Sequence, residues 1–297
     1  MNRVFSLCLL ILFQYSCSDG GNEEEIIIQD LNSTVQYKGV DNTDPNFLSL
    51  DIYYTSEMDN LKPVVIYIHG GGWSIGDKSN SLENKIRLFR SLNYVFISVN
   101  YRLSPFPFDI NNEDRIMYPD HNNDVADAVK WIYDTIVDYG GNNNKLVLLG
   151  HSAGAHLVSL TGTNSNFLEQ RGLFLSNIKG VATIDTEGYD VLAKTTEGDE
   201  MYINAFGTNL VSNTDASPIS NIFSEQNYPK FFVAKRGIDI RVNLANEFIN
   251  KLKLAGVQVA EVDGSIYTHE EINTAIGAEN ETLITEPLKE FLKSCFQ

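Results

Sequence analysis

Ser152 lies in a Gly-x-Ser-x-Gly pattern, with Gly150 two residues before it and Gly154 two residues after it. The apolar run 146–149 precedes the pattern, which predicts a strand, a sharp turn at the serine and a helix from Ala153. Such a turn strains the serine backbone, and glycine at both flanking positions removes side chains that would collide. The pattern therefore predicts a nucleophilic hydroxyl; the alternative is an ordinary strand-to-helix turn with a capping serine.

A glycine triplet, 70–72, follows the apolar run 64–68. Nucleophilic attack on an ester develops negative charge on the former carbonyl oxygen, and this charge needs preorganised donors about 3 Å away. Glycines let the backbone approach the substrate closely and present bare N–H groups. We expect these donors to be the amides of Gly71, Gly72 and Ala153.

The residues that flank the glycine triplet can have structural roles in place of roles in catalysis or binding. Trp73 either forms an apolar wall of the substrate pocket or covers the sheet, and both interpretations stay open. We expect His69 to bond within its own loop. A phosphate-binding interpretation of the glycines fails because no Lys-Ser/Thr pair follows them.

Three motifs, HGGGW at 69–73, NYRLSP at 100–105 and GHSAG at 150–154, together resemble a known family. They are similar to those of α/β-hydrolase fold serine esterases of the hormone-sensitive-lipase-like and feruloyl-esterase-like (BD-FAE-type) branches. The resemblance covers roughly residues 45–295. It implies a mostly parallel central sheet of about eight strands with helices on both faces, and a Ser-His-Asp triad.

A serine nucleophile needs a base, and in this fold the histidine follows the serine and the acid in chain order. Only His156 and His269 follow Ser152, and His156 would lie on the serine's own helix. His269 is therefore the expected base. His151 would point away from the hydroxyl and shape the turn. The residues after His269 look more like the feruloyl-esterase-like and arylformamidase-like branches than like lipases.

The acid that orients the base has two main candidates. Asp239 follows the apolar run 231–234, where the resemblance places the family's carboxylate, and it opens the next helix, so a capping role is the alternative. Asp185 follows the run 180–184, and some members of the fold take the acid from that loop. We predict Asp239, with Asp185 as the second choice.

Three other aspartates are weaker candidates. Asp263 lies on the same loop as the expected base, and Asp120 and Asp124 precede a helix in the manner of capping residues.

The elements that must position these residues alternate between strand and helix. Such alternation predicts an α/β protein with a mostly parallel sheet, in which ligands bind beyond the carboxyl ends of the strands. An alternating apolar segment, 48–54, predicts an antiparallel strand, and 186–229 is expected to form a cap above the site. Parallel strands are predicted at 64–68, 94–99, 146–149, 180–184, 231–234 and 259–262, and helices at 84–91, 124–139 and 244–255.

Composition limits the classes of partner. The 297-residue chain is 43% hydrophobic and 21% charged, as expected for a globular protein. Its formal charge of −17 argues against nucleic acid and anionic membrane surfaces, which require clustered lysine and arginine. No histidine pair has metal-ligand spacing and no nucleotide fingerprint is present, so no metal or cofactor is implied.

The first residues have the pattern of an export signal. Residues 4–13 form an apolar run after one positive charge, too short for a membrane span of roughly 20 residues. A small residue before Cys17 and an acidic stretch after it resemble a bacterial lipoprotein signal. We expect a signal peptide at 1–16, lipidation at Cys17, a flexible tether at 17–30 and a catalytic domain at 31–297. Release of a soluble protein is the alternative, and Cys295 is expected in a C-terminal helix.

These predictions combine into one hypothesis, an exported serine carboxylesterase without a cofactor. Its expected substrate is a small-molecule or polysaccharide-linked ester with a short-chain, aryl or acetyl group. Aryl-formamide or peptide hydrolysis by the same triad is one alternative, and a non-catalytic binding module of the same fold is another. The chain would meet a membrane only through its N-terminal lipid anchor.

Overall fold

The computed structural model describes residues 28–224 and 226–297. The predicted signal peptide, Cys17 and most of the predicted tether lie outside the described residues. Among the residues described, no helix combines the length and the apolar character that crossing a membrane requires.

One eight-stranded sheet forms the centre of the described chain, in the order β1-β2-β4-β3-β5-β6-β7-β8. The first two strands run antiparallel to their neighbours, and the remaining six are parallel. The predicted mostly parallel sheet is therefore confirmed, and β1 is an additional edge strand that sequence did not reveal. The strands are β1 (Asp30–Gln36), β2 (Ser49–Thr55), β3 (Lys62–Ile68), β4 (Val95–Val99), β5 (Gly141–His151), β6 (Ile178–Ile184), β7 (Lys230–Lys235) and β8 (Val259–Asp263).

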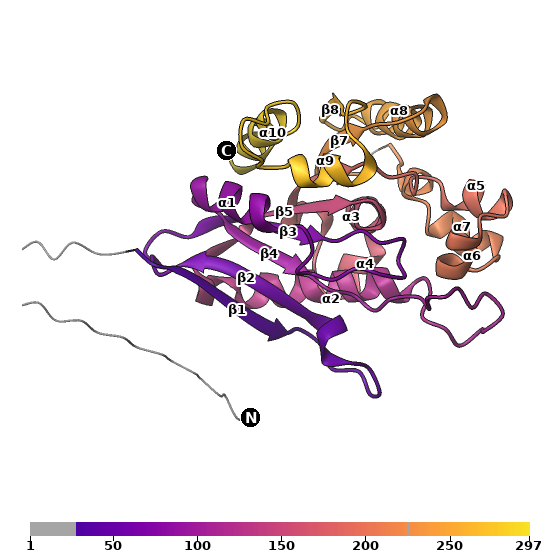
Figure 1. Cartoon of the computed structure of the whole chain (residues 1–297), viewed down its shortest axis with the longest axis horizontal. Coiled ribbons are helices and arrows are strands. Elements are labelled where there is room, and N and C mark those ends of the chain that lie inside the picture. Colours follow the sequence, from indigo (N-terminus) through magenta and orange to yellow (C-terminus); the bar gives the residue numbers. More distant parts are fainter. Residues whose placement is uncertain (1–27, 225) are drawn as a thin grey trace, which may run out of the picture.

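Helices cover both faces of this sheet (Figure 1). Buried side chains of α2, α3 and α8 pack on one face, and those of α1, α9 and α10 pack on the other. The helices are α1 (Glu83–Ser91), α2 (Asp120–Thr135), α3 (Ala153–Thr163), α4 (Asn166–Glu169), α5 (Val191–Thr196), α6 (Glu200–Phe206), α7 (Leu210–Asp215), α8 (Asp239–Leu254), α9 (His269–Ala275) and α10 (Thr285–Phe296).

The central strands are continuous apolar runs in the sequence because both of their faces are buried. In β3, Val64, Ile66 and Ile68 point into one core cluster, whereas Val65 and Tyr67 point into the other. Cys295 lies buried in α10, as expected for a residue of the C-terminal helix.

The segment between β6 and β7 carries the short helices α5, α6 and α7, which group together at the right of Figure 1. Five of its residues line the pocket that contains Ser152 and His269, and four of them lie within 186–229: Thr186, Glu187, Met201 and Tyr202. The predicted cap at 186–229 therefore contributes to this site.

Candidate active site

The turn at Ser152 has the strained geometry that its two glycines predict. Ser152 has φ 55° and ψ −119° between β5 and α3. A Cβ added to Gly150 would overlap the carbonyl oxygen of Gly154, and one added to Gly154 would overlap the carbonyl oxygen of Ile68. Glycine is thus required at both positions by close backbone approach, and the turn holds the serine at the carboxyl end of β5.

His269 is the first residue of α9, and its ring meets the serine. Its Nε2 lies 2.9 Å from Ser152 Oγ, within hydrogen-bond distance. The helix start is fixed by a capping box, in which Thr268 and Glu271 each bond the other's backbone amide. The structure therefore brings together the two residues that sequence selected as nucleophile and base, although 117 positions separate them.

The carboxylate beside His269 belongs to Asp185, and the prediction of Asp239 is wrong. Asp185 Oδ2 lies 2.6 Å from His269 Nδ1, on the opposite side of the ring from Ser152. Asp239 is the exposed first residue of α8, and its carboxylate has no hydrogen-bond or ion-pair partner within the described residues. It does not cap the helix either, because Ile238 occupies the N-cap position.

Strand order explains why both loops were candidates. β6 and β7 are adjacent parallel strands, so Asp185 and the segment after β7 reach the same edge of the sheet. Asp185 has φ 47°, a conformation that turns its backbone sharply at the strand end. Asp263, the weaker candidate, is exposed and bonds the backbone of Ser265 instead.

Two arginines from the segment after β7 also hold the Asp185 carboxylate, and sequence reasoning missed both. Arg236 Nε donates to Oδ2, and Arg241 Nη2 donates to Oδ1 at 2.8 Å. Burial alone would raise the pKa of Asp185, but the hydrogen bonds from His269, Arg241 and Arg236 outweigh it and hold that pKa well below its usual range. The available signal was the placement of both arginines within three residues of Asp239, where the acid was expected.

The glycine loop lies directly beside the serine. A Cβ added to Gly70 would lie 3.0 Å from Ser152 Cβ, and Gly71 and Gly72 line the same pocket as Ser152. Within residues 28–224 and 226–297, the amides of Gly71 and Gly72 donate no hydrogen bond. The amide of Ala153 belongs to the first turn of α3, where no intrahelical acceptor exists. All three predicted donor positions are thus free to bind an anion.

Trp73 does not line this pocket, so its prediction as a pocket wall is wrong. It is only 2% exposed, and its ring packs edge-on against Tyr202, Phe206 and His156 beneath the site. The other interpretation, that Trp73 covers the sheet, agrees with its place in the core cluster that contains Ile66 and Ile68 of β3.

The pocket has a cavity of ≈350 Å³ and a mixed lining. Aromatic and aliphatic side chains form its apolar part, and the polar part comes from the Ser152–His269–Asp185 group, Arg241 and two glutamates. Its lining comprises Gly71, Gly72, Ser74, Ile75, Phe106, Phe108, Ser152, Asp185, Thr186, Glu187, Met201, Tyr202, Arg241, His269 and Glu270. Across the described part of the chain, no three His, Cys, Asp or Glu side chains are arranged to hold a metal ion.

The other histidines near the site have structural contacts. His151 Nε2 donates to the backbone oxygen of His269 at 2.9 Å, and burial together with the neighbouring imidazole lowers the pKa of His151 to about 3. His156 is buried between Trp73 and α7, and burial lowers its pKa to about 4. His69 Nδ1 donates to the oxygen of Gly70, which confirms that it bonds within its own loop.

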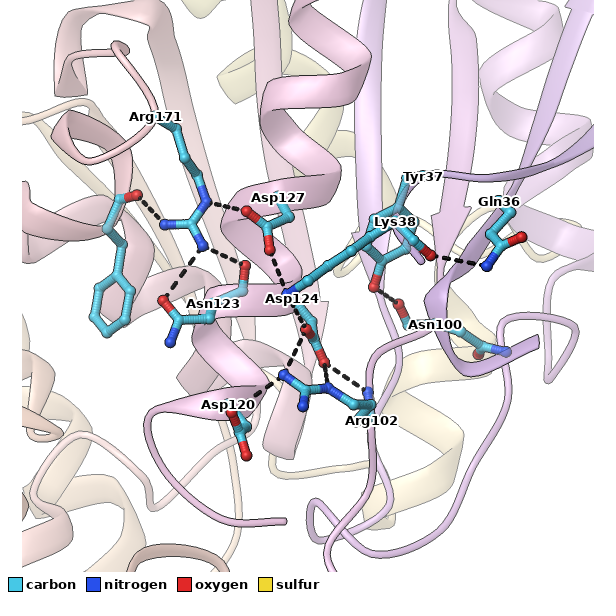
Figure 2. Close-up of polar contacts among 11 residues, drawn as sticks. Gln36, Tyr37, Lys38, Asn100, Arg102, Asp120, Asn123, Asp124, Asp127 and Arg171 are labelled. Atoms are coloured by element: carbon cyan, nitrogen blue, oxygen red, sulfur yellow. Dashed lines mark hydrogen bonds and ion pairs between the residues drawn. The ribbon is translucent and has the colours of Figure 1, made fainter. Parts of the chain in front are cut away.

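A buried ion-pair network supports the NYRLSP segment (Figure 2). The guanidinium of Arg102 donates two hydrogen bonds to Asp124, of 2.7 and 2.9 Å, and one of 3.1 Å to Asp120. The backbone amide of Arg102 donates a further one of 3.1 Å to Asp124. Lys38 also pairs with Asp124, whose side chain is fully buried. The interpretation of Asp120 and Asp124 as helix caps is therefore wrong, because α2 follows Pro119 without a side-chain cap.

Comparison with solved structures identifies the fold. Among solved structures, an inhibited esterase B from Lactobacillus rhamnosis superposes with a TM-score of 0.69 at 19% identity, covering 90% of this chain and 86% of that one. Thermogutta terrifontis esterase 2 phosphonylated by sarin superposes with a TM-score of 0.70 at 20% identity, covering 88% and 94%. The fold is therefore that of the α/β-hydrolases, as predicted.

The family follows from the sequence comparison. The BD-FAE family model matches residues 50–246, and the chain belongs to that family. A Mycobacterium tuberculosis protein named "Probable carboxylic ester hydrolase LipM" is 28% identical over 70% of this chain and 49% of its own length. Esterase LipC of the same organism is 26% identical over 69% and 52%. The chain thus spans about half the length of these curated relatives.

Proposed function

We propose that this protein is a serine carboxylic-ester hydrolase with the triad Ser152–His269–Asp185. One observation carries the proposal: an unbroken hydrogen-bond chain from Ser152 Oγ through both ring nitrogens of His269 to Asp185, with lengths of 2.9 and 2.6 Å. Because a carboxylate only accepts, Nδ1 carries the ring proton, which leaves Nε2 free to take a proton from the serine. That is the tautomer that general-base catalysis needs.

Acylation follows from this arrangement. Ser152 Oγ attacks the ester carbonyl carbon while His269 Nε2 takes the hydroxyl proton. The oxyanion that forms accepts hydrogen bonds from the free amides of Gly71, Gly72 and Ala153. Collapse breaks the bond to the leaving oxygen, which takes the proton from Nε2 and departs as the alcohol.

Deacylation repeats these steps with water. Water gives a proton to His269 Nε2 and attacks the acyl carbon, and the bond to Ser152 Oγ then breaks. The serine recovers its proton from Nε2, and the carboxylic acid is released. Throughout, Asp185 stays ionised and stabilises the imidazolium.

Pocket size and lining support short-chain, acetyl or aryl esters as substrates. A cavity of ≈350 Å³ accommodates a small acyl or aryl group, and Phe106, Phe108 and Tyr202 supply aromatic surface. With the export signal expected from the first residues, we further propose a lipid-anchored protein outside the cytoplasm that acts on small or polysaccharide-linked esters. Radiolabelled palmitate incorporation into the parent and into Cys17→Ala tests the anchor.

The test of activity uses the parent protein and Ser152→Ala. We expect the parent to hydrolyse p-nitrophenyl acetate and butyrate and to react covalently with a fluorophosphonate probe, and the variant to do neither. Faster turnover of N-formyl anilides or peptides would favour amide hydrolysis by the same triad. Absence of both hydrolysis and labelling in the folded parent would overturn the proposal and favour a binding module.

A further inference from the structure

The acid of the proposed triad is held from behind by two cations. Both arginines follow β7 in the chain: Arg236 lies in the loop that leads into α8, and Arg241 lies in the first turn of α8. Arg236 Nε bonds the same oxygen of Asp185 that His269 bonds, and Arg241 Nη2 bonds the other oxygen at 2.8 Å. The side chains of Arg236 and Arg241 are 16% and 20% exposed, so both ion pairs are mostly shielded from water.

This arrangement determines the plane of the carboxylate. Three N–H donors bind two oxygens, and each arginine approaches from a direction that His269 does not occupy. Asp185 itself has φ 47°, a conformation that a non-glycine residue keeps only when its surroundings hold it. The described ion pairs of Asp185 are those with Arg236, Arg241 and His269.

Arg241 also connects the acid to the cap. Its Nη1 bonds Glu187, which lines the pocket, and Glu187 pairs with Lys194 of α5 at 3.3 Å. The guanidinium therefore bridges two carboxylates of one loop, and this bridge keeps the loop after β6 folded against α8.

We propose that Arg236 and Arg241 are positioning residues, which hold the Asp185 carboxylate in the orientation that serves His269. This inference rests on the proposed esterase function. It assigns a changed role to the segment after β7: in place of the acid, that segment supplies two cations that clamp an acid from the loop after β6. Asp239, between the two arginines, takes no part.

The clamp has a kinetic consequence that a structural contact elsewhere would lack. A contact elsewhere would change only the amount of folded protein. Loss of either arginine should lower kcat per folded molecule, because the carboxylate that orients His269 is then misplaced.

Arg236→Gln is the principal test, because Arg236 does not line the pocket and Arg241 does. We expect kcat on p-nitrophenyl butyrate to fall about 10- to 100-fold with KM within about threefold, because misplacing the acid affects mainly the transition state. Arg236→Lys keeps the charge but loses the Nε donor. It should recover part of kcat. Arg241→Gln should lower kcat in the same way, with an added effect on KM.

Arg171→Gln is the matched control. Arg171 is 13% exposed and bonds Asp127, Asn123 and the backbone oxygen of Phe167 (Figure 2). It is not among the residues that line the pocket of Ser152. Arg171→Gln should lower the thermal unfolding temperature about as much as Arg236→Gln does, because each variant loses a mostly buried arginine. Its kcat per folded molecule should stay at the parental value.

The outcomes separate the clamp from the esterase proposal. Absence of esterase activity in the parent protein would refute the proposed function itself. If the parent is active, a parental kcat in Arg236→Gln would overturn the clamp alone. An equal loss of kcat in Arg171→Gln would also overturn it, because the effect would then be general destabilisation.

Discussion

Replacing Asp185 with asparagine tests which carboxylate serves His269. The carboxylate accepts from three donors: His269 Nδ1, Arg236 Nε and Arg241 Nη2. Asparagine offers one oxygen and one NH₂ group in the same plane, so at least one donor must face another donor. If the NH₂ group faces His269, the ring must place its proton on Nε2, where it cannot accept from the serine.

The cost can be estimated from this tautomer argument. In serine hydrolases, changing the orienting aspartate to asparagine with intact geometry lowers kcat about 10⁴-fold, and removing the aspartate lowers it about 3 × 10⁴-fold. We therefore expect Asp185→Asn to lose about 10⁴-fold in kcat, or ~5.5 kcal/mol of transition-state stabilisation. Asp239→Asn should keep kcat within about twofold, since the Asp239 carboxylate is exposed and contacts neither His269 nor the arginines.

Initial rates on p-nitrophenyl butyrate at pH 8 measure this difference, with circular dichroism to confirm that both variants are folded. Residual activity in Asp185→Asn should rise with pH if hydroxide replaces the missing base. A large loss in Asp239→Asn, together with a loss of less than about tenfold in Asp185→Asn, would refute the assignment of the acid.

Two further predictions concern the scaffold. Gly154→Ala should fail to fold or lose several kcal/mol of stability, because its Cβ would overlap a carbonyl oxygen of β3. The control is Gly39→Ala, which should change the melting temperature little because no atom lies within 4 Å of the added Cβ. Equal shifts in melting temperature for the two variants would contradict this prediction. Burial lowers the pKa of Lys85 from 10.5 to about 7, so above pH 7 the unfolded chain binds more protons there than the folded chain. Stability from this group should therefore rise from pH 7 to pH 10, and urea unfolding at both values should show a steeper rise in the parent than in Lys85→Met.

Local sequence patterns predicted much of the fold and two members of the site. Apolar runs marked the parallel strands because those strands are buried on both faces, and the pattern of Gly150 and Gly154 marked the nucleophile because backbone contacts within one turn require it. His269 followed from chain order and from the small number of histidines after Ser152. The strand and serine signals depend on neighbouring residues, and the histidine signal depends on the chain order of nucleophile, acid and base that holds throughout the fold.

The acid and the buried polar contacts could not be predicted in this way. The loops after β6 and β7 both end beside His269, so the local pattern allowed either Asp185 or Asp239. The choice depends on side chains from separate elements: the backbone turn at Asp185 points one carboxylate inward, and the arginines after β7 neutralise it.

Trp73 and Asp124 were misjudged for the same reason, since their partners lie on other elements. The sequence by itself determined the sheet, the proposed nucleophile and the proposed base, and the tertiary structure decided which carboxylate meets the imidazole. A buried charge is stable only where partners surround it, and those partners are brought together by the fold and not by their spacing along the chain.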